Sequence, residues 1–407
     1  MLSVSEARRV LLDGVSALEA AEVAPSEASG RTLAASVVAD RDAPPTDRSS
    51  MDGFAVRAAD AATPGRTLRV IGEVRAGASA DGLLLGPGEA ARIFTGSVIP
   101  AGADAVVMVE LTEENRAEGR VRIAEQVERG QNIRPRGEDR RAGECVLAAG
   151  TTIRAAEIAA LAAVGCLRVP VVRPPRVAVL ATGDELVAID GTPAPHQIRN
   201  SNAPMLAALL GGEGAVARVH GTVADDLDAL AAAVGAVSDA DLVVLSGGVS
   251  VGDYDLVEEA ARRRGYEVLF HNVAMRPGKP ILAARRGRRL LFGLPGNPLS
   301  AFAGFHVLVA PVVRRLMGDP HLRPRRLRAT LAEAVRQRPG REGYVLARLA
   351  WPEGVPVVAQ VRSASSGDVL SLARANAFIV VPAEAASLEA GALVDVMAWD
   401  ARAPGGA

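Results

Sequence analysis

The sequence predicts a multidomain protein of the α/β plus β class, for three reasons. The chain has 407 residues, more than one ordinary domain of about 100–200 residues. Apolar strands alternate with helical patterns over 175–325, which is typical of a doubly wound, mostly parallel sheet. Short β-type runs between Gly and Pro residues fill 44–140 and return after 326, which predicts two small β domains, the second of them β-barrel-like.

Helical patterns flank the first β region. Apolar spacing predicts helices over 3–20, 26–40 and 154–165, the last ended by Gly165. If these helices pack together, the β region is an insertion between them. We therefore expect a helical linker domain of 1–43 and 141–174, an inserted β domain of 44–140, an α/β domain of 175–325 and a C-terminal β domain of 326–407.

Composition excludes several classes of function. The 46 basic and 47 acidic residues nearly cancel, so the basic footprint of a nucleic-acid binder is absent. Charged residues interrupt the apolar positions of 1–15, and the apolar run at 301–313 is too short to span a membrane. Cys145 and Cys166 have no metal-ligand spacing, and we expect both to be buried in a protein of the reducing cytoplasm.

Open α/β sheets bind ligands at the carboxyl ends of their strands, so the loops that follow the strands of 175–325 are candidate site segments. In the first loop, "ATGDELV", a strand is followed by Asp184 and Glu185. Adjacent carboxylates can hold a hydrated Mg²⁺ ion. The alternative is a helix N-terminus, where acidic residues oppose the helix dipole.

The second loop is "LSGGVSVGDYD", where Ser246, Gly247 and Gly248 follow a strand and Ser250 and Asp253 precede a helix. Glycines let backbone N–H groups approach an anion, and a helix start adds partial positive charge. Asp253 adds a candidate metal ligand. A glycine-rich loop alone is equally typical of a tight turn.

The third loop, "AMRPGKPIL", contains the only lysine among the 46 basic residues. Arg276 and Lys279 bracket a Pro-Gly turn, so two cations can converge on one small anion. A bias of the genome towards Arg explains the other basic residues but not why position 279 keeps a lysine.

The fourth loop is "GLPGNPLSAF", formed by Pro295, Gly296 and Asn297 ahead of a helix. Asn297 can act as N-cap, with Pro298 at the first helical position and Ser300 in the first turn. A well-capped helix without a ligand is the alternative. Together the four loops supply acids and cations suited to a phosphate-plus-metal pocket.

The inserted β region contributes polar turns of its own. Asp52 and Thr95 lie in "SSMDGFAV" and "FTGSVIP", and Arg134 and Asp139 lie in "NIRPRGEDRR". Ordinary turns and a solvated loop would also explain these residues.

In chain order, the motifs "SSMDGFAV", "RIFTGSVIPAGADAVVMVE", "IRPRGED", "AVLATGDEL", "IRNSN", "VVLSGGVSVGDYD", "RPGKP", "GLPGNPLSAF" and "SSGDVLSLARAN" resemble those of the molybdopterin molybdenumtransferases, the MoeA and gephyrin E-domain family. The resemblance runs from residue 1 to about 400. It implies insertion of molybdate into adenylylated molybdopterin with Mg²⁺-dependent release of AMP. It also implies a homodimer with the pocket between subunits, and molybdopterin adenylyltransferase and acceptor molybdoenzymes as partners.

The resemblance implies roles for individual residues. Catalytic positions map to Asp52, Thr95, Asp139, Glu185 and Asp253, and Mg²⁺ ligands to Asp184, Glu185 and Asp253. Molybdate ligands map to Arg276, Lys279, Ser300, Arg341 and Ser366, and the remaining substrate-binding positions to Arg134, Ser246, Gly247, Gly248, Ser250, Pro295, Gly296 and Asn297. The family often has Lys where this chain has Arg276.

Two other functions are weighed against this one. Molybdopterin adenylyltransferases resemble the α/β domain, but they have a Thr-Gly-Gly-Thr-Gly loop where this chain has "SGGVSVG", and they lack the flanking β domains. A non-catalytic cofactor-binding scaffold is the other possibility, since the eukaryotic E domain also binds receptor tails.

Overall fold

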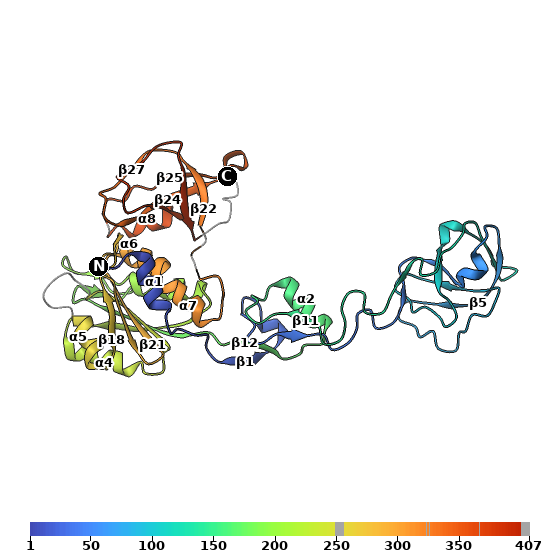
Figure 1. The fold of residues 1–407 in the computed structure, drawn as a ribbon. Coiled ribbons are helices and arrows are strands. Elements are labelled where there is room, and N and C mark those ends of the chain that lie inside the picture. Colours follow the sequence, from blue (N-terminus) through green and yellow to red (C-terminus); the bar gives the residue numbers. More distant parts are fainter. Residues whose placement is uncertain (249–255, 323, 325, 366, 400–407) are drawn as a thin grey trace. The chain divides into compact units, whose positions relative to one another are not determined.

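The computed structural model describes residues 1–248, 256–322, 324, 326–365 and 367–399, and Figure 1 shows its fold. The chain divides into two compact units. Unit 1 comprises Met1–Ala34, Gly150–Arg154 and Pro170–Ala407, and unit 2 comprises Ala35–Ala149 and Ala155–Val169. The four-domain division predicted from the sequence stays a prediction.

Unit 1 is built on a six-stranded sheet with the order β16-β13-β17-β21-β20-β18. The strands are β13 (Arg176–Thr182), β16 (Val216–Val223), β17 (Leu242–Ser246), β18 (Glu267–His271), β20 (Leu282–Arg286) and β21 (Arg289–Leu294). The pairs β16/β13, β13/β17 and β17/β21 are parallel. A β20–β21 hairpin adds the antiparallel part, and β18 pairs antiparallel with β20. The predicted doubly wound, mostly parallel sheet is confirmed.

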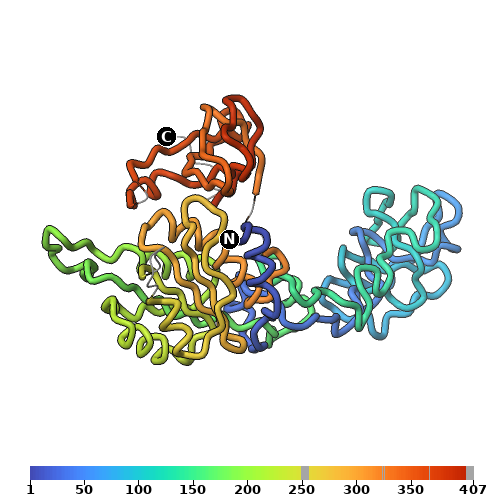
Figure 2. The backbone as a smooth tube through the Cα atoms, turned by 60° about the vertical axis from the view of Figure 1, so that its left-hand side comes forward, coloured from blue at the N-terminus to red at the C-terminus, as the bar shows by residue number. Residues whose placement is uncertain are grey.

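Helices cover both faces of this sheet. Helices α4 (Leu227–Ala236) and α5 (Leu256–Arg263) bury Leu230 and Val257 against one face. The other face is covered by α1 (Val4–Leu12), α3 (Asn202–Gly212) and the helical run that follows β21. Helix α1 lies beside α7 in both views (Figure 1 and Figure 2). A three-layer arrangement leaves the carboxyl edge of the sheet for a ligand.

The helical run after β21 is continuous over Pro298–Leu316 and passes through a π-helical turn. It consists of α6 (Pro298–Gly304), the π-helix Phe305–Val309 and α7 (Ala310–Leu316). The run has 19 residues and is apolar enough to cross a membrane by length and composition, but it is 78% buried inside the protein. The helical run extends beyond the apolar stretch 301–313 at both ends, because Pro311 is accommodated at the start of α7. It is the core helix of unit 1.

His306 lies in the π-helical turn, against an aromatic cluster. Its ring stacks on Trp399 with 5.6 Å between ring centroids and meets Phe302 edge-on at 4.6 Å. Burial, with a smaller contribution from the positive charge of Arg314, lowers the pKa of His306 to about 3. The imidazole is therefore neutral near pH 7 and packs as a core ring.

The C-terminal part of unit 1 is a small barrel, as predicted. Its strands follow the order β24-β25-β22-β28-β26, and β26 pairs back with β24 to close the ring. They are β22 (Arg326–Leu331), β24 (Glu342–Ala350), β25 (Val357–Gln360), β26 (Ala377–Val381) and β28 (Leu393–Ala398), with α8 (Val369–Arg374) between β25 and β26. A short strand from the α/β region, β19 (Met275–Arg276), pairs parallel with β24.

Unit 2 contains the predicted small β region. Its six-stranded sheet has the order β7-β4-β6-β5-β9-β8. These strands are β4 (Gly53–Val56), β5 (Thr67–Val74), β6 (Glu89–Ile93), β7 (Ala105–Met108), β8 (Thr112–Asn115) and β9 (Arg120–Ile123). Helix α2 (Ala155–Ala163) and the pair β2 (Val37–Val38) and β11 (Cys145–Leu147) complete the unit.

Three local predictions were wrong. No α-helix forms over 26–40, where only the end of a short 3-10 helix (Pro25–Glu27) falls; Thr32 and Leu33 instead make bridges to Thr152 and Val171, because tertiary pairing overrides a weak helical preference. Helix α1 ends at Leu12, and β1 (Ala20–Val23) occupies the end of the predicted 3–20 helix. Cys145 is exposed and Cys166 half-buried, so neither is the buried residue expected.

Candidate functional site

Three parallel strands of unit 1 end side by side. Ala181 of β13 pairs with Ser246 of β17, and Ser246 pairs with Leu294 of β21. The backbone N–H of Gly247 donates to the carbonyl of Leu294 over 3.0 Å. The predicted loops that begin at Gly183, Gly247 and Pro295 therefore leave the sheet as neighbours.

Gly247 is required by this close approach. It has φ of 96°, and a Cβ atom there would lie 2.0 Å from the carbonyl oxygen of Thr182. A Cβ on Gly248 would lie 2.7 Å from Thr182 Cγ2. The glycines of the "SGG" sequence thus serve strand-to-strand packing as well as any ligand.

The lysine loop reaches the same edge. His271 at the end of β18 pairs with Leu282 at the start of β20, so the loop between them lies at the carboxyl edge of the sheet. A Cβ on Gly278 would lie 3.3 Å from the carbonyl oxygen of Ser300. Ser300, in the first turn of α6, is 5% exposed. The structure therefore brings the predicted lysine loop against the predicted Ser300 turn.

Arg276 belongs to a cluster of cations. Because β19 pairs Arg276 with Gly343 of β24, Arg341 lies close to the lysine loop. Burial, followed by the positive charges of Arg341 and Arg338, lowers the pKa of Arg276. Within the described ranges, four cations form no ion pair with a carboxylate: Arg276, Lys279, Arg338 and Arg341. Like charges held together without counter-ions are typical of an anion site.

The acidic turn lies between β13 and β14 (Leu186–Val187). No helix follows Asp184 and Glu185, so the helix-dipole alternative is wrong. The backbone N–H of Asp225 donates to Asp184 Oδ1 over 3.2 Å, and the Thr182 hydroxyl donates to Asp225 Oδ1 over 2.5 Å. Asp225 is thus a third carboxylate of this edge that sequence reasoning missed. Its signal was available, since "ADD" directly follows the strand β16.

The carboxylates fit Mg²⁺ by their chemistry. Mg²⁺ takes one or two carboxylates and keeps waters that substrate phosphates can replace. Asp184 offers such oxygens, and its contact with the backbone of Asp225 brings a second acidic residue to the same turn. Among the residues with described positions, no group of three or more His, Cys, Asp or Glu side chains forms a metal site. Asp253, Ser250 and Ser366 lie outside the described residues.

Two asparagines near the site do not behave as the sequence predicts: Asn297 lacks its expected hydrogen bond, and Asn202 makes two that were not expected. Asn297 is at the N-cap position of α6, but its side chain makes no capping hydrogen bond. Asn202, which the sequence analysis assigned no role, donates to Ser246 Oγ and to the Gly296 carbonyl, each over 2.7 Å. It therefore connects two of the predicted loops.

The predicted residues of unit 2 form two bonded pairs. Asp52 accepts from the backbone N–H and the hydroxyl of Thr95 over 2.7 and 2.8 Å, and these bonds lower the pKa of Asp52. Arg134 donates to Asp139 over 2.5 Å and to Glu138 over 2.8 Å.

One short strand pair connects these two pairs. Arg48 of β3 (Arg48–Ser49) pairs with Arg134 of β10 (Ile133–Arg134). The Arg48 guanidinium also donates to the carbonyl of Gly96, the residue after Thr95, over 2.6 Å. All four predicted residues of unit 2 thus belong to one patch.

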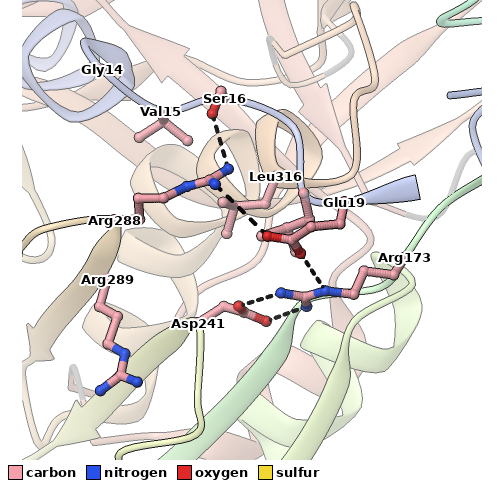
Figure 3. Close-up of a pocket in the computed structure, with 10 residues that line it drawn as sticks. Gly14, Val15, Ser16, Glu19, Arg173, Asp241, Arg288, Arg289 and Leu316 are labelled. Carbon is pink, nitrogen blue, oxygen red and sulfur yellow. Dashed lines mark hydrogen bonds and ion pairs between the residues drawn. The ribbon is translucent and has the colours of Figure 1, made fainter. Parts of the chain in front are cut away.

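A separate cavity lies at the amino ends of the strands of unit 1 (Figure 3). Arg173, Asp241, Glu19 and Arg288 line it, and Arg173 is paired with both Asp241 and Glu19. Since these charges are mutually satisfied, the cluster stabilises the fold and is separate from the strand-end site.

Comparison with known proteins assigns the class first. Residues 178–315 match the family model described as "Probable molybdopterin binding domain". Residues 2–165 match the MoeA N-terminal region (domain I and II), and 328–399 match the MoeA C-terminal region (domain IV). The α/β region is thus of the probable molybdopterin binding domain class, and MoeA regions flank it.

Relatives and solved structures agree over the whole chain. A molybdopterin molybdenumtransferase of Bacillus subtilis is 39% identical over 389 residues, which cover 92% of this chain and 89% of the relative. One of Staphylococcus aureus (strain Mu50) is 36% identical, covering 97% and 95%. The crystal structure of a molybdopterin biosynthesis MoeA protein from Pyrococcus horikoshii covers 98% of this chain and 99% of its own, with a TM-score of 0.85 and 31% identity. The chain belongs to the MoeA family of molybdopterin molybdenumtransferases.

Proposed function

We propose that this protein is a transferase that inserts molybdate into adenylylated molybdopterin, releasing AMP and giving molybdenum cofactor. The observation that carries the proposal is the cluster of Arg276 with Arg338 and Arg341, together with Lys279 on the same loop as Arg276. These cations lack carboxylate partners among the described residues, and the loop borders the buried Ser300 turn. A tetrahedral oxyanion suits two or three cations with a hydroxyl and backbone donors.

The other loops suit the second substrate, adenylylated molybdopterin, at the same edge of the sheet. Gly247 and Gly248 let the chain leave β17 close to Pro295 and Gly296, and this edge of the sheet would receive the pyrophosphate link of an adenylylated pterin. The sulfurs that receive molybdenum belong to the substrate, so the protein needs no redox group or nucleophilic cysteine. The role of the protein is then to hold two anions beside each other.

Mg²⁺ would be held by Asp184, Glu185 and Asp253, with Asp225 as a further carboxylate beside Asp184. When bound, Mg²⁺ neutralises charge on the phosphates of the link that is broken. The chain's own part is to keep Asp184 in place, through the Asp225 N–H, and Asp225 in place, through the Thr182 hydroxyl.

For the patch of unit 2, we propose that Asp52, Thr95, Arg134 and Asp139 act on the pocket of a second subunit in a homodimer. We also propose that the protein works in the cytoplasm, receives its substrate from a molybdopterin adenylyltransferase and passes its product to molybdoenzymes. These parts rest on the family resemblance of the motifs.

One assay tests the proposal. Purified protein is incubated with adenylylated molybdopterin, Mg²⁺ and molybdate, and both AMP release and activation of an apo-molybdoenzyme are followed. Molybdate-dependent appearance of both is the expected result. If the protein instead only adenylylates free molybdopterin with ATP and releases pyrophosphate, it is an adenylyltransferase. If neither reaction occurs, the scaffold alternative is favoured.

A further inference from the structure

Asn202 joins the two glycine-bearing loops of the site through one side-chain amide. It is the first residue of α3 and is 8% exposed. Its Nδ2 lies 2.7 Å from Ser246 Oγ, at the end of β17, and 2.7 Å from the carbonyl oxygen of Gly296, after β21. A single planar group thus sets the distance between the loops proposed to bind the adenylylated pterin.

The orientation of this amide is determined by its neighbours. If Oδ1 and Nδ2 were exchanged, Oδ1 would lie 2.7 Å from the Gly296 carbonyl, with two acceptors facing each other and no proton between them. Nδ2 must therefore face Gly296, and its second proton goes to Ser246 Oγ. Ser246 is the acceptor of that bond.

Two polar groups remain unused as a result. The Oδ1 atom of Asn202 is buried and has no hydrogen-bond partner among the described residues. The hydroxyl proton of Ser246, a residue 2% exposed, is also left to donate elsewhere. Buried acceptors without a donor are rare in folded proteins, so a bound group is expected to supply one. A pterin ring bears adjacent N–H and C=O groups and complements an acceptor beside a donor.

We propose that Asn202 is a positioning residue for the adenylylated pterin. It holds the end of β17, at Ser246, against Gly296 after β21, and with Ser246 it presents an acceptor and a donor side by side to the pterin ring. This inference rests on the proposed function, because that function supplies the substrate.

The chain offers a matched control two residues away. Asn200 is also 8% exposed, but its Oδ1 accepts from the N–H of Ala203 and its Nδ2 donates to Thr222 Oγ1. Among the described residues, the Asn200 side chain has no hydrogen bond to either glycine-bearing loop. Asn200→Ala removes a buried amide of the same size from the same segment.

The test measures KM for adenylylated molybdopterin, KM for molybdate, and the midpoint of thermal unfolding. Asn202→Ala should raise KM for the pterin substrate at least about ten-fold, while KM for molybdate stays within about two-fold, because the cation cluster is untouched. A purely structural effect would lower the active fraction and so kcat, without moving KM. Asn200→Ala should lower the unfolding midpoint and leave both KM values unchanged.

Asn202→Asp keeps the shape but sets a carboxylate oxygen against the Gly296 carbonyl, so it should raise the same KM even if Asn202→Ala proves unstable. Ser246→Ala combined with Asn202→Ala should cost less than the product of the two single effects, since both act on one contact. If the wild type is active and Asn202→Asp has an unaltered KM for adenylylated molybdopterin, the positioning role of Asn202 is overturned and the proposed function stands. An inactive wild type would instead overturn the proposed function.

Discussion

Arg173 and Asp241 form a bidentate ion pair at the amino ends of the strands of the α/β sheet of unit 1 (Figure 3). Nη1 of Arg173 lies 2.7 Å from Oδ2 of Asp241, and Nη2 lies 2.9 Å from Oδ1. Burial alone would raise the pKa of Asp241, but hydrogen bonds from Arg173 and from the Arg176 N–H lower it. The pair ties the segment that precedes β13 to the residue that precedes β17.

The first prediction concerns this pair. Arg173→Met should lower the free energy of unfolding by about 1–3 kcal/mol, because it leaves a half-buried carboxylate without its charged partner. Arg288 lines the same cavity, but its side chain is 67% exposed and its contacts are long, 3.7 Å to Glu19 and 3.3 Å to Ser16 and Ala17, so Arg288→Met should cost less than about 0.5 kcal/mol. Urea unfolding measures both, and equal costs for the two variants would contradict the prediction.

The second prediction separates close packing from backbone strain. Gly247→Ala would put a methyl group 2.0 Å from the Thr182 carbonyl at φ of 96°, and should cost at least about 3 kcal/mol and abolish activity. Gly221→Ala has a similar φ of 86° with nothing within 4 Å, so it should cost only about 1 kcal/mol. Unfolding midpoints check this, and a tolerated Gly247→Ala would show that the strand-end loops are less tightly packed than described.

The third prediction is a dependence of stability on pH. The pKa of His306 is lowered to about 3 in the folded state, against about 6.5 in an unfolded chain. The unfolded state therefore binds the extra proton, so this stability is complete above pH 6.5 and is lost progressively as pH falls towards 3. The slope from this residue is about 1.4 kcal/mol per pH unit.

His306→Phe should reduce that slope between pH 6 and pH 4.5 while keeping the ring contacts with Phe302 and Trp399. His220→Asn removes an exposed imidazole on strand β16 and serves as the control for the loss of a histidine as such. Denaturant unfolding at several pH values gives both slopes. Identical pH profiles for His306→Phe and wild type would contradict the burial of a neutral imidazole.

The fourth prediction concerns Lys279. Lys279→Ala should raise KM for molybdate about ten-fold or more, equivalent to about 1.4 kcal/mol of lost binding, and leave KM for adenylylated molybdopterin nearly unchanged. Lys279→Arg should have a KM for molybdate between those of the wild type and Lys279→Ala, because a guanidinium keeps the charge but not the compact shape of the ammonium. Unchanged activity of Lys279→Ala at limiting molybdate would remove Lys279 from the proposed site.

Much of the strand-end site could be predicted because it follows from local patterns. Strands such as 176–182 are short apolar runs, and ligand-binding loops of open sheets follow such strands. The same rule should have selected Asp225, but β16 is largely exposed and its apolar pattern is weak, so the residues after it drew no attention.

Contacts between distant segments could not be predicted. Nothing in "PGREGY" shows that β24 will pair with β19 and bring Arg338 and Arg341 to Arg276. The helix predicted over 26–40 failed for the same reason, since bridges to Thr152 and Val171 decide its conformation. The hydrogen bonds of the Asn202 amide could not be predicted either, because its partners lie 44 and 94 residues away in the sequence.

The solitary lysine also makes the protein chemically addressable. Position 279 holds the only ε-amine of the chain, half-buried in the loop that borders Ser300. Reductive methylation with ¹³C-formaldehyde would therefore label one side chain and the N-terminal amine. The methyl resonance of Lys279 would then report on this loop: its chemical shift could be followed as each anion is added, without substituting a residue.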